Sequence, residues 1–107
     1  MVSAWILLLV AGLFEIGWAI GLEYSNGFTE LVPSIATVVS LVISMLLLAR
    51  AVQSLPIGTA YAVWTGIGAV GAATLGIVLF SESASFGRIV FISFIVIGVV
   101  GLNFVSH

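Results

Sequence analysis

The chain has 107 residues, of which 63% are hydrophobic and only 6% are charged, and its formal net charge is -2. This composition is typical of an integral membrane protein and leaves almost no residues for a soluble domain. It excludes cysteine-dependent chemistry, because the sequence contains no cysteine, and it offers no basic patch for binding nucleic acid.

Four apolar stretches are each close to the ~20 residues that a membrane-spanning helix requires. They cover residues 3–22, 33–49, 57–80 and 88–105. The sequence therefore predicts an all-α integral membrane protein with a single four-helix transmembrane domain over residues 1–107. The first stretch lacks the basic start and the small-residue cleavage site of a secretory signal, and we interpret it as a retained helix.

The first stretch contains one acidic side chain, Glu15, near the middle of an otherwise uncharged run over residues 2–22. A charge at the centre of a spanning helix costs about 2.5–3.5 kcal/mol on insertion scales, so such a residue is by default a candidate for ion or substrate handling. Helical spacing places four residues on the same face as the acid, namely Ala11, Gly12, Trp18 and Ala19. This small-residue face is suited to close packing or to lining a cavity.

The connections between the stretches are short and contain turn-forming residues. Asn26-Gly27 tolerates the left-handed backbone of a tight turn, and Pro33 and Pro56 are expected to open the second and third helices. The connection over residues 81–85 supplies hydroxyl groups that can cap the fourth helix. Three acids fall at these edges and are interpreted as solvated loop charges, namely Glu23, Glu30 and Glu82.

The second stretch carries a stripe of hydroxyl side chains, Thr37, Ser40 and Ser44, at i, i+3 and i+7. Hydroxyl groups inside a membrane prefer a hydrogen-bond partner. Two interpretations remain open for the stripe: a contribution to a site opposite a carboxylate, or bonding back to the carbonyl groups of its own helix.

The third stretch combines aromatic residues with clustered glycines. Tyr61 and Trp64 lie several residues inside the span, where their polar atoms need partners that a cavity can supply. Gly68, Ala72 and Gly76 repeat every four residues, which allows another helix to approach closely. The same glycines favour either close packing or a bend in the middle of the membrane.

The fourth stretch has no acidic side chain and is predicted to be an assembly helix. Glycine and phenylalanine residues recur at alternating four- and three-residue spacing along one seam suited to a partner helix, at Gly87, Phe91, Phe94, Gly98 and Gly101. A single thin four-helix chain is poorly suited to enclosing a substrate path, which favours at least two copies. Two copies would bring two Glu15 side chains together, and like charges in a low-dielectric site disfavour joint ionisation.

The basic side chains are Arg50, after the second span, and Arg88, at the start of the fourth, on opposite membrane faces. The difference in Lys and Arg between the two sides orients membrane proteins, and here the sides are balanced. We therefore expect insertion in both orientations and an antiparallel homodimer with inverted halves. A single orientation, set by the amino terminus or by cellular factors, is the alternative.

Several motifs together resemble the small multidrug resistance transporters over essentially the full length. They are Gly12, Glu15 and Trp18, the loop Tyr-Ser-Asn-Gly-Phe at 24–28, Pro33-Ser34, and Pro-Ile-Gly-Thr-Ala-Tyr-Ala-Val-Trp-Thr-Gly-Ile-Gly at 56–68. A tryptophan one turn after the acid looks like the guanidinium exporter subtype rather than the polyaromatic-cation subtype. The resemblance implies an antiparallel dimer in the bacterial inner membrane that exchanges a guanidinium-like cation for protons, without a cofactor or metal.

The resemblance also implies roles for individual side chains. Glu15 would be the shared ligand for protons and cation, and Trp18 and Ser44 would orient its carboxylate by hydrogen bonds. Tyr61 and Trp64 would line the portal and the pocket.

Glycines have implied roles as well. Gly12 would make room beside the acid, Gly66-Ile67-Gly68 would be the bending point, and Gly98 and Gly101 would belong to the dimer contact. The chain departs from related sequences at Glu23 and Asn103, where lysine is common. Both departures lie at membrane edges and bear on loop electrostatics more than on chemistry.

Other functions remain open alongside this one. An exporter of bulky quaternary ammonium cations would differ in pocket size, and a subunit of a heterodimeric pair would show a charge bias that the balanced arginines lack. A small dual-topology ion channel would not need a titrating acid at its centre. A purely structural subunit requires Glu15 to be a satisfied packing acid. We predict no enzyme activity, because no catalytic constellation of a soluble enzyme is present.

Overall fold

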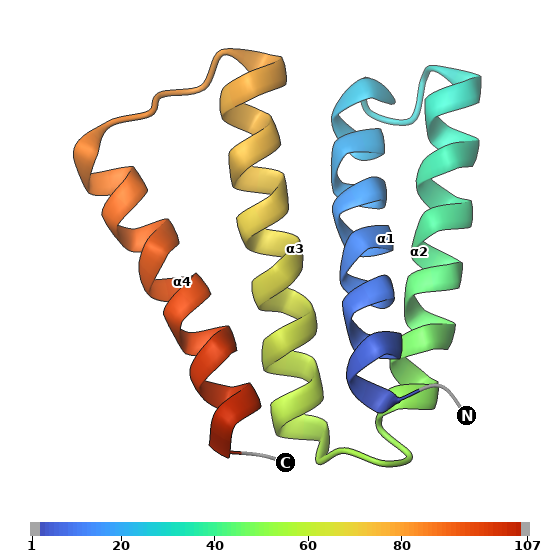
Figure 1. The fold of residues 1–107 in the computed structure, drawn as a ribbon. Helices are drawn as coiled ribbons and strands as arrows, with labels where there is room; N and C mark the ends of the chain where they lie inside the picture. The colour runs from blue at the N-terminus through green and yellow to red at the C-terminus, as the bar shows by residue number, and fades with distance from the viewer. Residues whose placement is uncertain (1–2, 106–107) are drawn as a thin grey trace.

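The computed structural model describes residues 3–105, which form four α-helices joined by short connections (Figure 1). The helices are α1 (Ala4–Tyr24), α2 (Leu31–Ala51), α3 (Ile57–Phe80) and α4 (Phe86–Val105). Each is 20 to 24 residues long and apolar enough to cross a bilayer. The predicted all-α fold with four candidate membrane-spanning helices is confirmed.

The helix ends follow the local chemistry of the connections. Asn26 and Gly27 take the expected left-handed backbone, with φ of 50° and 72°, and the turn continues into Phe28 at 66°. Pro56 is the N-cap of α3, whereas α2 begins two residues before Pro33 and places that proline in its first turn. Ser85 caps α4, because its hydroxyl accepts a hydrogen bond from the backbone N–H of Arg88 over 3.3 Å.

The helices stand side by side in the order α2, α1, α3, α4, so the chain forms a thin slab (Figure 1). Its principal extents are 40 × 34 × 19 Å, and the smallest corresponds to about two helix diameters of 10–12 Å each. α1 packs extensively on both α2 and α3, but α2 and α3 barely meet. α1 therefore lies between α2 and α3 and separates them.

Glycine notches bring α1 close to its two neighbours. On the α2 side, a Cβ added at Gly17 would lie 3.4 Å from the hydroxyl oxygen of Ser40, and one at Gly21 would lie 2.5 Å from that of Thr37. On the α3 side, a Cβ at Gly71 would overlap the side chain of Ile16. Small residues at these crossings allow the helix backbones to approach, as is typical of membrane helix packing.

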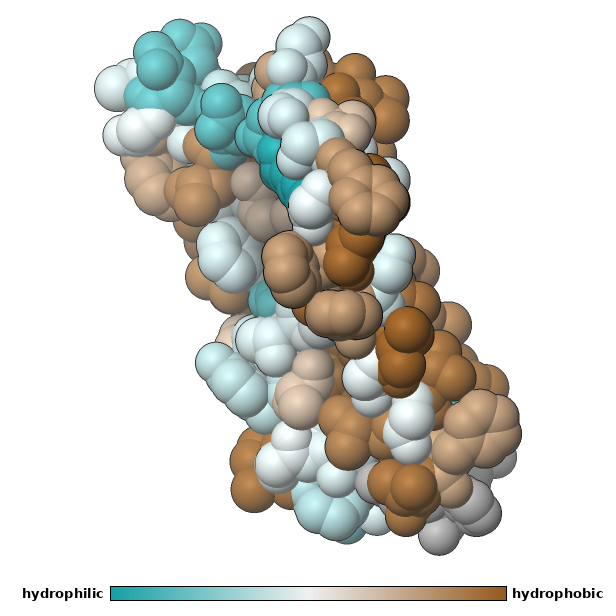
Figure 2. Space-filling model, turned by 90° about the vertical axis from the view of Figure 1, so that its left-hand side faces the viewer, coloured by the Kyte–Doolittle hydropathy of each residue, from teal (hydrophilic) through white to brown (hydrophobic). Residues whose placement is uncertain are grey.

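α4 is the least packed of the four helices. It has no buried residue and contacts α3 alone among the helices. Figure 2, viewed from the α4 side, shows apolar side chains along the length of the molecule and hydrophilic ones gathered mainly at the end with the α3–α4 connection. A Cβ at Gly87, Gly98 or Gly101 would meet nothing within 4 Å. The seam predicted for a partner helix is open in this chain.

The acid Glu82 is solvated as predicted and also has a partner that the sequence did not indicate. Its side chain is 45% exposed, its Oε1 accepts a hydrogen bond from Arg88 over 2.6 Å, and it packs against Gly76. Arg50 lies in the last turn of α2, at the opposite end of the helices from Arg88 (Figure 1). The loop sequence alone could not predict the ion pair, because it depends on how residues 81–85 fold over the end of α3.

Candidate functional site

Glu15 lies near the middle of α1 with only 8% of its surface exposed. Its Oε1 accepts a hydrogen bond from the indole Nε1 of Trp18 over 3.0 Å. The two residues are three positions apart on one helix, a spacing that brings side chains onto the same face. The carboxylate is therefore oriented by its own helix.

Gly68 of α3 provides the space in which the Glu15 side chain lies. A Cβ at this position would overlap Cγ of Glu15 and would lie 2.7 Å from its Oε2. The absence of a side chain at Gly68 is thus a steric requirement of the observed carboxylate position. Sequence reasoning grouped Gly68 with packing and bending and did not connect it with the acid.

Ser44 joins three helices through a fully buried hydroxyl group. Its Oγ donates to the backbone carbonyl of Ala11 on α1 over 2.6 Å and accepts from Nε1 of Trp64 on α3 over 2.8 Å. The family resemblance implied a hydrogen bond from Ser44 to the Glu15 carboxylate. In this chain the hydroxyl bonds instead to the backbone one turn before Glu15. The reason is geometric, since Ser44 faces the α1 backbone at Ala11.

The rest of the hydroxyl stripe behaves differently from Ser44. Thr37 is buried and its Oγ1 donates to the carbonyl of Pro33 over 2.7 Å, which is bonding within its own helix. Ser40 lies beside Gly17 at the α1–α2 crossing. Thr37 thus bonds back to a carbonyl group of its own helix, which is one of the two interpretations left open. Ser44 bonds to another helix, but to its backbone and not to a carboxylate.

Two aromatic side chains of α3 lie beside this network. Trp64 is 6% exposed, whereas Tyr61 is 53% exposed, and their ring centroids are 5.5 Å apart with an interplanar angle of 51°. Trp64 therefore belongs to the buried hydrogen-bond network. Tyr61 lies one turn nearer the start of α3 and presents its ring outside the packed core.

The remaining predicted glycines have distinct surroundings. Gly12 does not leave open room beside the acid, because the side chain of Ile67 fills that space and a Cβ at Gly12 would lie 2.5 Å from its Cγ2. Gly66 faces α4, where a Cβ would lie 2.5 Å from Cγ2 of Val99. α3 is one continuous helix through Gly66 and Gly68.

The electrostatic feature of the site is a buried carboxylate without a basic neighbour. Among residues 3–105 the ion pair between Arg88 and Glu82 is the only one, and it lies at a helix end. No group of three or more metal-ligating side chains occurs among the same residues. A carboxylate removed from water is costly unless it is protonated or paired with a cation, so the site has the chemistry to bind either.

Four apolar helices with a buried mid-helix acid that has no basic partner among the described residues are typical of a small membrane transporter. Comparison with known families supports this class, since the model of the Small Multidrug Resistance protein family matches residues 3–95. The chain belongs to that family. It is an integral protein of the bacterial inner membrane, and membership indicates a transport role rather than an enzymatic one.

Three curated relatives are similar over nearly their whole length. A guanidinium exporter of Escherichia coli (strain K12) is 56% identical over 104 residues, which cover 97% of this chain and 99% of the relative. A guanidinium exporter of Yersinia pseudotuberculosis is 60% identical over 103 residues, with 96% and 99% covered. A guanidinium exporter of Salmonella typhimurium is 56% identical over 104 residues, with 97% and 99% covered.

Proposed function

We propose that this protein exports guanidinium and small guanidinyl cations in exchange for protons, with both competing for Glu15. The observation that carries the proposal is the buried Glu15 carboxylate, which has a hydrogen bond from Trp18 but no basic partner among the described residues. Three relatives at 56–60% identity named as guanidinium exporters support the choice of substrate.

The geometry of guanidinium suits this carboxylate. Guanidinium is planar and its donors meet a carboxylate through two parallel hydrogen bonds. Oε1 of Glu15 already accepts from Trp18, while Oε2 accepts no hydrogen bond from residues 3–105. The rings of Trp18, Trp64 and Tyr61 can bind a flat cation face-on, contributing about 0.5–2 kcal/mol depending on desolvation.

The functional unit in this proposal is an antiparallel homodimer. One chain leaves every residue of α4 at least partly exposed. A second copy would bring a second Glu15 opposite the first and bury the open seam at Gly98 and Gly101. Two carboxylates that cannot both ionise readily would exchange protons for one cation.

The exchange cycle follows from this competition. Protons hold the site when no cation is present, and a cation displaces them when it binds. The dimer must switch the site from one side of the membrane to the other readily only when either protons or the cation are bound. Otherwise the proton gradient and the cation gradient would not be coupled. A bend at Gly66 and Gly68 would give α3 the freedom for that change.

Guanidinium-driven proton movement in proteoliposomes tests the proposal. The native protein and Glu23→Gln, which removes an acid at the membrane edge, should both couple a guanidinium gradient to proton movement. Glu15→Gln should not. Equal proton movement by Glu15→Gln would overturn the proposal, and a strong response to tetra-alkylammonium without one to guanidinium would indicate an exporter of bulky cations.

A further inference from the structure

Ile67 lies on α3 between two glycines and reaches across to α1. Its Cγ2, Cβ and Cδ1 would lie 2.5, 2.8 and 3.2 Å from a Cβ at Gly12, so the side chain fills the notch at that glycine. Gly12 is one helical turn before Glu15 and shares its face. Ile67 is therefore the apolar wall beside the acid.

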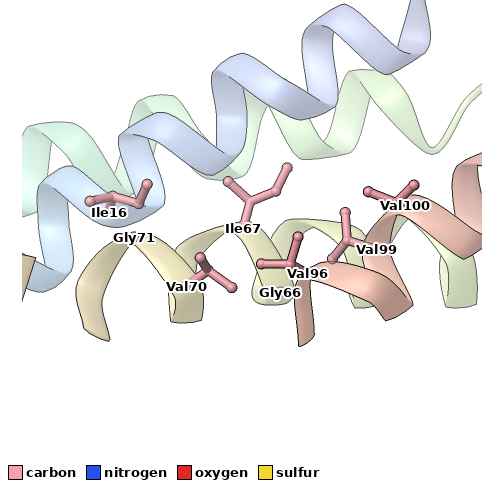
Figure 3. Close-up of a pocket in the computed structure, with 8 residues that line it drawn as sticks. All are labelled: Ile16, Gly66, Ile67, Val70, Gly71, Val96, Val99 and Val100. Atoms are coloured by element: carbon pink, nitrogen blue, oxygen red, sulfur yellow. The ribbon is translucent and has the colours of Figure 1, made fainter. Parts of the chain in front are cut away.

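Two cavities lined mainly by apolar side chains lie on the far side of Ile67. One of about 260 Å³ lies between α3, α4 and Ile16 of α1, and all its lining residues are apolar or glycine (Figure 3). Another of about 230 Å³ lies toward Trp5 and Asn103. Both cavities are lined by Ile67, and Figure 3 shows its side chain directed toward α1 above the first cavity.

The Glu15 site and the cavities lie on different faces of α3. Tyr61, Trp64 and Gly68 follow i, i+3 and i+7 spacing along the face of the site, whereas Val63, Ile67 and Val70 follow the same kind of spacing along the face of the cavities. The seam between α1 and α3 separates the two faces. At the level of Gly12, Ile67 fills that seam.

We propose that Ile67 sets the upper size of the transported cation by separating Glu15 from these cavities. The inference rests on the proposed guanidinium exchange and adds a specificity-determining residue to it. With Ile67 in place, a cation at Glu15 has no apolar space for a hydrocarbon substituent behind the α1–α3 seam. Shortening Ile67 joins the site to the cavities and gives an alkyl substituent a place to lie.

Transport of a homologous series tests the proposal, with guanidinium and its methyl, ethyl, propyl and butyl derivatives as substrates in proteoliposomes. In the native protein KM should not fall as the chain lengthens. In Ile67→Ala, KM should fall by about fourfold for each methylene that enters the cavity, while guanidinium itself is still exchanged for protons. Ile67→Val should shift the profile in the same direction by less.

Val96→Ala is the matched control, because Val96 lines the first cavity from α4 without contacting the α1 notch. Its chain-length profile should equal that of the native protein. The proposal is overturned if Ile67→Ala keeps the native profile, or if Val96→Ala shifts it equally. If Ile67→Ala transports nothing, Ile67→Val decides, and an unchanged profile in that variant overturns the proposal.

Failure of the specificity proposal is distinguishable from failure of the proposed function. A native protein that exchanges guanidinium for protons but already prefers butylguanidinium would refute the role of Ile67 alone. A native protein that moves no protons in response to guanidinium would refute the exchange itself.

Discussion

The indole Nε1 of Trp18 donates a hydrogen bond to Oε1 of Glu15 across 3.0 Å, one turn apart on α1. Because both residues belong to one helix, the carboxylate is oriented before any partner or substrate arrives. Gly68 of α3 then sets the depth at which the carboxylate lies. The central acid is thus held by contacts within one chain.

Replacing Trp18 by Phe removes the hydrogen bond and keeps an aromatic ring beside Glu15. A hydrogen bond to a charged group contributes about 1.5–3 kcal/mol, so we expect kcat/KM for guanidinium to fall by roughly 10- to 100-fold. Transport assays in proteoliposomes measure this loss. Trp5→Phe makes the same change on α1 away from the acid and should retain native kinetics. Native rates in Trp18→Phe would show that the bond has no role in transport.

Replacing Gly68 by Ala should displace Glu15, because the added Cβ would overlap its Cγ. We expect guanidinium binding to weaken by at least about fivefold, since overpacking of this kind costs roughly 1–3 kcal/mol unless the carboxylate moves away from its observed position. Binding can be measured by titration of the purified protein. Gly58→Ala is the control, because nothing lies within 4 Å of a Cβ there. Equal affinities for both variants would contradict the steric role of Gly68.

Ser44→Ala removes the hydroxyl that connects Ala11, on α1, with Trp64, on α3. The buried indole N–H of Trp64 would lose its partner, and we expect the free energy of unfolding to fall by about 1–3 kcal/mol. Reversible unfolding in mixed detergent measures the change. Ser93→Ala, at an exposed hydroxyl that bonds within α4, should change it by less than about 0.5 kcal/mol. Equal stability of the two variants would refute a linking role for Ser44.

Gly98→Leu should weaken the proposed dimer without disturbing the fold of one chain, because no described atom lies within 4 Å of a Cβ at this position. Close approach of helices in membranes depends on small residues, so a leucine side chain would separate them. We expect a shift from dimer to monomer in single-molecule photobleaching in lipid, with unchanged helix content. If Gly98→Leu is dimeric to the same extent as the native protein, Gly98 is not part of the dimer contact.

The four helices and the central acid were predictable because each depends on local sequence. Apolar length fixes a spanning helix, and one carboxylate in an uncharged run is visible without any tertiary information. The hydrogen bond from Trp18 was likewise accessible, since i, i+3 spacing within a helix brings the two side chains together.

The contacts between helices were not predictable in the same way. Whether Ser44 meets the Glu15 carboxylate or the Ala11 carbonyl depends on the exact rotation of α2 about its axis. The hydroxyl stripe indicates which face of α2 is polar, but not which atom of α1 that face meets. The contact of Ile67 with Gly12 and that of Glu15 with Gly68 depend in the same way on the rotations of α1 and α3, which the sequence pattern does not fix. Glycine spacing indicates that a notch exists but not which side chain enters it.

Competition between guanidinium and protons for Glu15 is tested most directly by counting the protons released when guanidinium binds. Isothermal titration of the purified protein in buffers of different ionisation enthalpy gives that number. We predict proton release by the native protein, with guanidinium affinity that weakens as the pH falls, and neither binding nor release in Glu15→Gln. Guanidinium binding without proton release, at an affinity independent of pH, would contradict the exchange mechanism.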